Sequence, residues 1–170
     1  MEVDTKVKLI SAENDERLID IGLLNLSETL KTIYESYNTD KAITEVPLKE
    51  ISTKNLDLII KFLQHYKDTY NEIKEIPKPF PDSVDEAMFK TLLNNDEFIF
   101  KYLNDLNVPE TISLINAANH LQIIKLVIFL QAKLAYEMCN CDIEKAREKM
   151  GIVCDMNEEE KEEMDKYPLD

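Results

Sequence analysis

Residues 114–123 read LINAANHLQI, and the spacing of their apolar side chains sets how the second half of the chain folds. Leu114, Ala117, Ala118 and Leu121 recur at intervals of three and four residues, which is the repeat of one face of an α-helix. Alanine is small, so a neighbouring helix can approach this face closely. The segment therefore predicts a closely packed helix within a helical C-terminal half.

Helical patterns flank this segment on both sides. Upstream, residues 85–103 carry a helical apolar repeat that the two asparagines at 94–95 can break. Asn107, with Pro109 in the following turn, supplies the start of the next helix. Downstream, residues 126–138 are apolar nearly all round, which predicts a helix buried on more than one side.

Two further helix signals lie near the end of the chain. Asp142 can cap a short helix that stops at Gly151, since glycine tolerates the positive φ of a helix C-terminus. Asn157, with Glu160 three residues later, forms a start resembling a capping box for an acidic final helix. The second half is thus predicted to contain only helices.

The first half of the chain reads as a mixture of strands and helices. Two short β-prone runs, residues 7–9 and 18–21, are separated by the polar stretch 13–16 and predict a β-hairpin. A third short strand is expected at residues 43–46, closed by Pro47. Together these runs predict a small three-stranded sheet.

Helices are predicted on either side of the third strand. Residues 26–37 have helical spacing, and a second helical stripe begins at Ser52 or Thr53, either of which can cap it, and ends at about residues 65–68. Residues 69–84 hold Pro77, Pro79 and Pro81 and form the main internal linker. The predicted fold class is therefore α+β.

The charge of the chain excludes several classes of partner. Acidic residues outnumber lysine and arginine 34 to 20, which gives a net charge of −14. Such a chain is repelled by phosphate backbones and anionic membranes, and it attracts basic protein surfaces. We expect neither nucleic acid nor a membrane as partner. The N-terminus shows no targeting pattern, so we expect the protein in the cytoplasm and nucleus.

Residues that carry chemistry are few. The chain has 2 glycines, Gly22 and Gly151, which excludes a glycine-rich phosphate loop. Cys139, Cys141 and Cys154 can either hold a metal together with a histidine or fill a helix junction as small apolar side chains. Their spacing is not that of the usual zinc sites and favours the second interpretation. We expect no catalytic residue, metal or cofactor.

The C-terminal helices carry more apolar side chains than a single core stripe needs. The surplus includes Ile112, Ile115, Ile123, Ile124 and Ile128. Two explanations remain open: a protein partner covers these side chains, or a second layer of the same chain does.

Several segments, taken in order along the chain, resemble the S-phase kinase-associated adaptors of SCF ubiquitin ligases. The likeness begins at Val7–Ser11 and continues through Leu30–Ile33, Val46–Leu48 and His65–Asp68. The strongest match is Leu114–Ile123, which is similar to the LILAANYLDI segment of that family. The segments after Asp142 are similar to the two C-terminal helices of these adaptors, whereas the related elongin C normally ends soon after its AAN-type motif.

The resemblance implies an architecture and a set of partners. It implies a BTB/POZ domain at residues 1–122, followed by a helical C-terminal extension at residues 123–170 of the kind that binds F-box proteins. In the family, the first part contacts the N-terminal region of a cullin and the last helices contact the F-box of a substrate receptor. The chain would thus be a non-catalytic adaptor subunit of a ubiquitin ligase in protein degradation.

Site residues follow from the same resemblance. Asn119 and His120 would lie at the cullin contact. The F-box contact would use apolar side chains from the last helices, namely Leu126, Leu130, Ile143, Met150, Ile152 and Met164.

The chain also departs from the family pattern. His120 stands where the family has tyrosine and Asn94 where it has tryptophan, and the terminal tryptophan is missing. Glu158 follows Asn157 where a proline is often found, so no hydroxyproline switch is expected there. The alternative function is a non-catalytic BTB scaffold of another complex, elongin C-like or kinetochore-like, without cullin binding.

Overall fold

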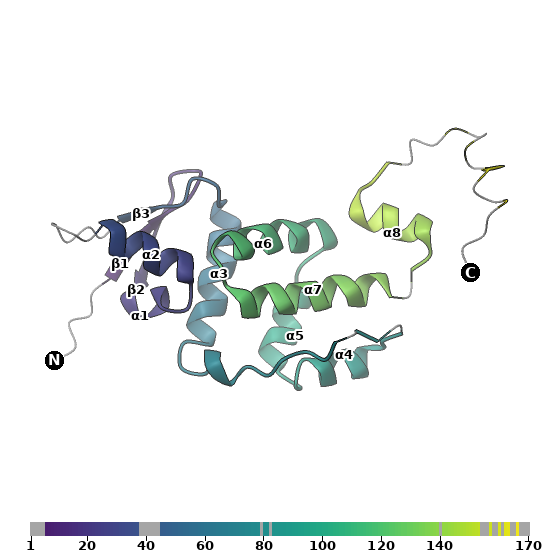
Figure 1. Ribbon diagram of the computed structural model, residues 1–170, viewed down its shortest axis with the longest axis horizontal. Helices are drawn as coiled ribbons and strands as arrows, with labels where there is room; N and C mark the ends of the chain where they lie inside the picture. Colours follow the sequence, from purple (N-terminus) through teal and green to yellow (C-terminus); the bar gives the residue numbers. More distant parts are fainter. Residues whose placement is uncertain are drawn as a thin grey trace.

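The computed structural model describes residues 6–37, 45–78, 80–81, 83–139, 141–153, 157, 160, 162–163 and 166. Within this part of the chain a small sheet is followed by a series of helices, as Figure 1 shows. The sheet, with α1 and α2, lies at one end of the molecule, and α8 lies at the other end beyond α6 and α7 (Figure 1). The α+β class predicted from the sequence is confirmed.

The sheet has the strand order β2-β1-β3. β1 (Lys6–Ile10) and β2 (Glu16–Asp20) form an antiparallel hairpin, and β3 (Glu45–Pro47) pairs parallel to β1 on the other side. Asn14 turns the hairpin with φ 65°, in the left-handed region that asparagine tolerates. The predicted hairpin is present, and a third strand is present but includes Pro47; residues 43 and 44 of the expected strand lie outside the described residues. Four side chains of one sheet face are at most 2% exposed: Val7, Leu9, Ile19 and Val46.

A short helix begins where the sequence predicts the end of a strand. Ile21 was expected in the second strand, but it is the first residue of α1 (Ile21–Leu24), which leads into α2 (Glu28–Tyr37). Leu23 and Leu24 are each 2% exposed. Adjacent residues of a strand point to opposite faces, so a sheet covered on one side cannot bury both, whereas a helical turn can.

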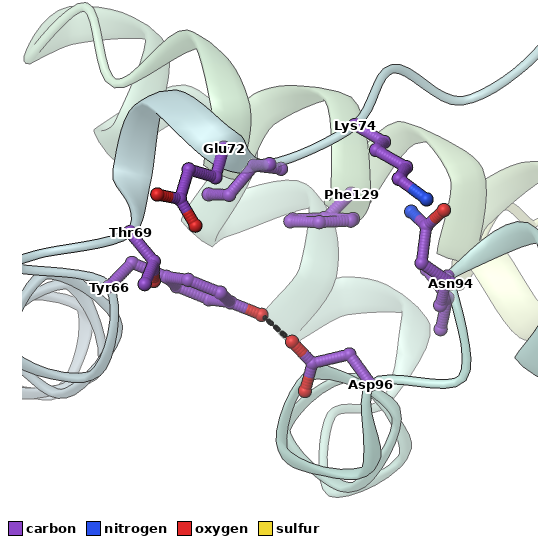
Figure 2. Close-up of a pocket in the computed structure, with 9 residues that line it drawn as sticks. Tyr66, Thr69, Glu72, Lys74, Asn94, Asp96 and Phe129 are labelled. Atoms are coloured by element: carbon purple, nitrogen blue, oxygen red, sulfur yellow. Dashed lines mark hydrogen bonds between the residues drawn. The ribbon is translucent and has the colours of Figure 1, made fainter.

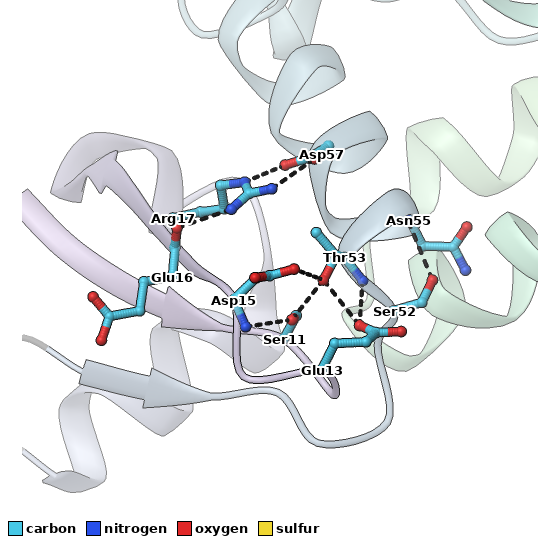
Figure 3. Close-up of polar contacts among 9 residues, drawn as sticks. All are labelled: Ser11, Glu13, Asp15, Glu16, Arg17, Ser52, Thr53, Asn55 and Asp57. Atoms are coloured by element: carbon cyan, nitrogen blue, oxygen red, sulfur yellow. Dashed lines mark hydrogen bonds and ion pairs between the residues drawn. The ribbon is translucent and has the colours of Figure 1, made fainter.

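The hairpin turn is tied to the start of α3 (Thr53–His65), as Figure 3 shows. The Ser52 side chain accepts a hydrogen bond from the backbone N–H of Asn55 and caps the helix. The Glu13 carboxylate accepts from the Thr53 backbone N–H at 2.7 Å and from the Thr53 hydroxyl at 2.9 Å. Arg17 of β2 donates to both carboxylate oxygens of Asp57 in α3.

Hydrogen bonds from the Thr53 backbone and hydroxyl hold the pKa of Glu13 below its ordinary value. The stabilisation from this carboxylate is therefore fully present above the pKa that Glu13 has in the unfolded chain. It is lost as pH falls through the lower pKa that Glu13 has in the folded chain. We expect the wild-type chain to lose unfolding free energy more steeply below about pH 5 than Glu13→Gln does. Urea unfolding at a series of pH values measures this, with Glu35→Gln, at an exposed position of α2, as control. Identical pH profiles for wild type and Glu13→Gln would contradict the prediction.

The predicted linker is packed against the core. After the short 3-10 helix η1 (Tyr70–Glu72), the described residues have no regular structure until α4 begins. Residues 79 and 82 lie outside the described part. Ile76 and Val84 in this stretch are 6% and 1% exposed. The described residues around Pro77 and Pro81 form no helix, as predicted, and two apolar anchors pack the segment against the core.

The remaining helices lie where the sequence predicts them, although α7 begins two residues before the expected 126, and most of the expected final acidic helix lies outside the described residues. α4 (Glu86–Leu92) and α5 (Glu97–Asn104) are separated by Asn94 and Asn95, whose φ angles are 58° and 56°. α6 (Val108–His120) starts with a capping box between Asn107 and Glu110. α7 spans Ile124–Met138, and α8 spans Ile143–Met150 with Asp142 as N-cap and Gly151 at φ 68° as C-cap.

One hydrophobic core joins the sheet to the helices. It extends from Val7 of β1 to Ala132 of α7, so α7 packs in the same core as the strands. Ile123 is 0% exposed, so part of the surplus apolar surface is covered by the chain itself. The boundary expected at residues 122 and 123 stays a prediction. Among the described residues, no helix has both the length and the apolar composition needed to cross a bilayer.

Candidate interaction surfaces

Asn119 and His120 lie in the last turn of α6, and both are exposed. Two side chains at the start of α2 hold this end of the helix. The Ser27 hydroxyl donates to the carbonyl of Leu121 at 2.5 Å, and the Thr29 hydroxyl donates to the carbonyl of His120 at 3.0 Å. We call the exposed pair the Asn119–His120 corner.

The chain reverses sharply after this corner. Gln122 has φ 53°, and the N–H of Ile123 donates to the carbonyl of Ala118 at 2.9 Å. Ile123 is fully buried, so the turn is anchored on its inner side. His120 Nδ1 lies 3.5 Å from an oxygen of the exposed Glu50 carboxylate. The corner is thus a fixed, polar projection of the surface.

Leu126 and Leu130 do not lie on a surface. Both are 0% exposed and belong to the common core. A partner could reach them only if that core opened, so they do not contribute to a candidate F-box surface in this conformation. The reason is that α7 packs on several sides, and these two leucines are on its inward faces.

The other expected F-box residues that the structure describes lie on α8 or just after it. Ile143 and Ile152 are 52% and 55% exposed, and Met150 is half-buried. None of the residues of α8 itself is buried. Val153, which the resemblance did not single out, is 84% exposed and follows Ile152 in the chain. Met164 lies outside the described residues.

A carboxylate near the end of α7 holds α8 in place. Glu137 Oε1 lies 2.6 Å from Nζ of Lys133, and Glu137 Oε2 lies 2.9 Å from Nζ of Lys149 in α8. Lys149 also donates to the backbone carbonyl of Glu137 at 2.9 Å. Partial burial raises the pKa of Glu137, but hydrogen bonds from the two lysines outweigh it and hold the pKa below its ordinary value.

Glu137→Gln is expected to loosen α8 and to lower the free energy of unfolding by about 1–3 kcal/mol, because it leaves the buried Lys133 ammonium without its counter-charge. Hydrogen exchange of the amides in residues 143–150 should become faster, while exchange in α3 changes little. Glu148→Gln, at an exposed position of α8, is the control. Unchanged exchange in α8 would show that other contacts hold this helix.

The residues considered for chemistry have other contacts. The thiols of Cys139 and Cys141 lie 3.2 and 3.1 Å from the backbone carbonyl oxygens of Tyr136 and Glu137, and Cys139 packs against the core. The His65 ring stacks on Phe98 at 3.6 Å. In the part of the chain that the structure describes, no three His, Cys, Asp or Glu side chains are grouped to hold a metal ion. Cys154 lies outside that part.

Comparison with known proteins supports one class. No family model matches the chain. The chain is similar to a protein of Tetrahymena thermophila, with 26% identity over 156 residues that cover 92% of this chain and 87% of the relative. That relative is named S-phase kinase-associated protein 1 homolog. This likeness supports a place for the chain among proteins of the S-phase kinase-associated type.

Proposed function

We propose that the chain is an adaptor of an SCF-type ubiquitin ligase that joins the N-terminal region of a cullin to F-box proteins. It takes no part in bond chemistry and acts by holding a substrate receptor near the ligase. The proposed domain with the sheet is of the BTB/POZ type, and the proposed place of action is the cytoplasm and nucleus.

The observation that carries this proposal is the separation of two exposed surfaces. The Asn119–His120 corner lies at the end of α6 beside α2. Figure 1 shows α8 at the far end of the α6–α7 pair, and the exposed side chains of Ile143, Ile152 and Val153 lie on α8 or directly after it. α7 has 15 residues and so spans roughly 22 Å at the ordinary helical rise. Two partners can bind at such a separation without contact between them.

The two surfaces also differ in chemistry. The corner presents an amide and an imidazole on a rigid turn, which suits specific polar contacts with a folded partner. The α8 surface presents isoleucine and valine side chains, which suits an amphipathic helix that needs an apolar seat. One chain therefore offers two distinct modes of recognition, as an adaptor requires.

Asn119→Lys combined with His120→Lys is expected to weaken binding of a cullin N-terminal fragment by at least about 30-fold, because two long cations replace contacts at a fixed corner. Binding of an F-box segment should stay within about twofold, since that surface lies at the other end of the molecule. Isothermal titration calorimetry with cullin and F-box segments from the source organism measures both affinities.

The control for added charge is Gln64→Lys with Thr91→Lys, at exposed positions of α3 and α4. This pair should leave both affinities unchanged. Equal loss of both partners in the corner variant would refute the assignment of the corner. Absence of cullin binding by the wild-type chain would favour a scaffold of another complex.

A further inference from the structure

A small cavity lies on a face of the molecule that neither candidate surface includes. It has a volume of about 230 Å³ and is bounded by the end of α3, the chain after it, the loop between α4 and α5, and α7 (Figure 2). Pockets for drug-sized ligands have volumes of about 300–1,000 Å³. This cavity is therefore of a size for one side chain rather than for a cofactor.

Two aromatic rings form the inner wall. Tyr66 and Phe129 lie with ring centroids 6.4 Å apart and ring planes inclined by 25°. They are 5% and 3% exposed, so packing on their other sides holds them rigid. Leu93 and Ile73 complete the apolar lining. Only a small part of each ring borders the cavity, so the rings give it a rigid apolar wall.

A carboxylate stands beside these rings. Asp96 accepts a hydrogen bond from the Tyr66 hydroxyl at 2.6 Å, which Figure 2 shows, and from the backbone N–H groups of Phe98 and Ile99 at 3.0 and 3.2 Å. These bonds occupy three of its roughly four acceptor positions and fix its orientation. Burial and Asp96 together raise the pKa of Tyr66, so its hydroxyl remains a donor. Within the described residues, Asp96 forms no ion pair.

The rim of the cavity is acidic on balance. Glu72 lies at the mouth and, like Asp96, forms no ion pair with another described residue. Lys74 is the one basic side chain among the lining residues. The cavity therefore has two carboxylates against one ammonium, in a chain whose net charge is −14. Positive charge on a partner is attracted both by the cavity and by the chain as a whole.

We propose that this cavity binds the guanidinium group of an arginine side chain from a basic segment of a protein partner. The planar cation lies against the apolar inner wall and donates to the free acceptor position of Asp96, while Glu72 adds attraction at the mouth. A guanidinium is planar, weakly hydrated and carries several N–H donors, whereas an ammonium is a compact and strongly hydrated charge, so arginine is preferred to lysine. The cavity thus forms a third recognition site, independent of the adaptor function proposed above.

The test is an NMR titration of the full-length ¹⁵N-labelled chain with Nα-acetyl-arginine N-methylamide. Saturable shifts are expected at the amides of Ile73, Leu93 and Phe129, with a Kd on the order of a few millimolar, as suits a single side chain. The corresponding lysine compound should bind at least about threefold more weakly. The citrulline compound, which has the same shape without the charge, should give no saturable shift. Equal binding of lysine and arginine, or of citrulline and arginine, would overturn the proposal, as would absence of saturable shifts.

Charge substitutions at the mouth distinguish binding in the cavity from attraction by the net charge of the whole chain. Glu72→Lys should weaken binding of the arginine compound by about fivefold. Glu75→Lys makes the same change at an exposed neighbour that does not line the cavity, and it should weaken binding by less than about twofold. Lys74→Glu should tighten binding by about threefold to fivefold. All three positions are exposed, so the fold is not at risk. Equal effects of Glu72→Lys and Glu75→Lys would overturn the proposal.

Discussion

Leu130→Ala is expected to lower the free energy of unfolding by about 2–5 kcal/mol, the usual cost of a leucine truncated in a packed core. Leu130 is 0% exposed and lies in the core shared by the sheet and the helices. Removing its isopropyl group leaves a cavity that the surrounding helices cannot fill. Urea unfolding followed by circular dichroism measures the change.

Ile124→Ala is the matched control on the same helix. Ile124 is 54% exposed at the first position of α7. Its truncation should change the free energy of unfolding by less than about 0.5 kcal/mol. A small cost at Leu130, close to that at Ile124, would mean that Leu130 faces solvent and is free to contact a partner after all.

Ile143→Asp combined with Ile152→Asp is expected to weaken F-box binding by more than about 100-fold. Ile143 is the first residue of α8 and Ile152 follows its C-cap, both are exposed, and a carboxylate in a desolvated apolar contact is costly. The free energy of unfolding should change by less than about 1 kcal/mol, because neither residue is buried. Calorimetry with an F-box segment and urea unfolding measure the two effects.

The control variant replaces two apolar residues of similar exposure that lie far from α8 in the sequence or on another helix. Leu18 in β2 is 64% exposed and Ile124 in α7 is 54% exposed. Leu18→Asp with Ile124→Asp should leave F-box affinity within about twofold. Retained affinity in the α8 variant would remove this helix from the proposed surface, whereas equal loss in both variants would point to a general effect of negative charge.

Local signals allowed most of the helix and strand boundaries to be predicted from the sequence. Asn107, Asp142 and Gly151 act as the caps that their residue types predict. The capping box expected at Asn157 is present as two reciprocal hydrogen bonds of 2.9 Å with Glu160. Each of these features depends on atoms within four residues, which a sequence displays directly.

Features that depend on three-dimensional packing were not predictable in the same way. Apolar residues lie on all sides of α7, so their spacing does not show which side faces the core. It therefore cannot distinguish the buried Leu130 from the exposed Ile124. The link between Glu137 and Lys149 joins two helices across a turn and has no signature in the sequence. The cavity beside Tyr66 needs four separate segments to meet, which only the folded chain reveals.

The Asn119–His120 corner depends on hydrogen bonds between residues that are 94 and 91 positions apart, from Ser27 to Leu121 and from Thr29 to His120. During synthesis the ribosome releases the N-terminal sheet long before it releases these acceptors. The corner can therefore form only after α6 has emerged and docked, which makes it a late product of maturation. A chain that ends before residue 120 lacks both acceptors, so a partner that reads this corner would distinguish such fragments from chains that extend past α6.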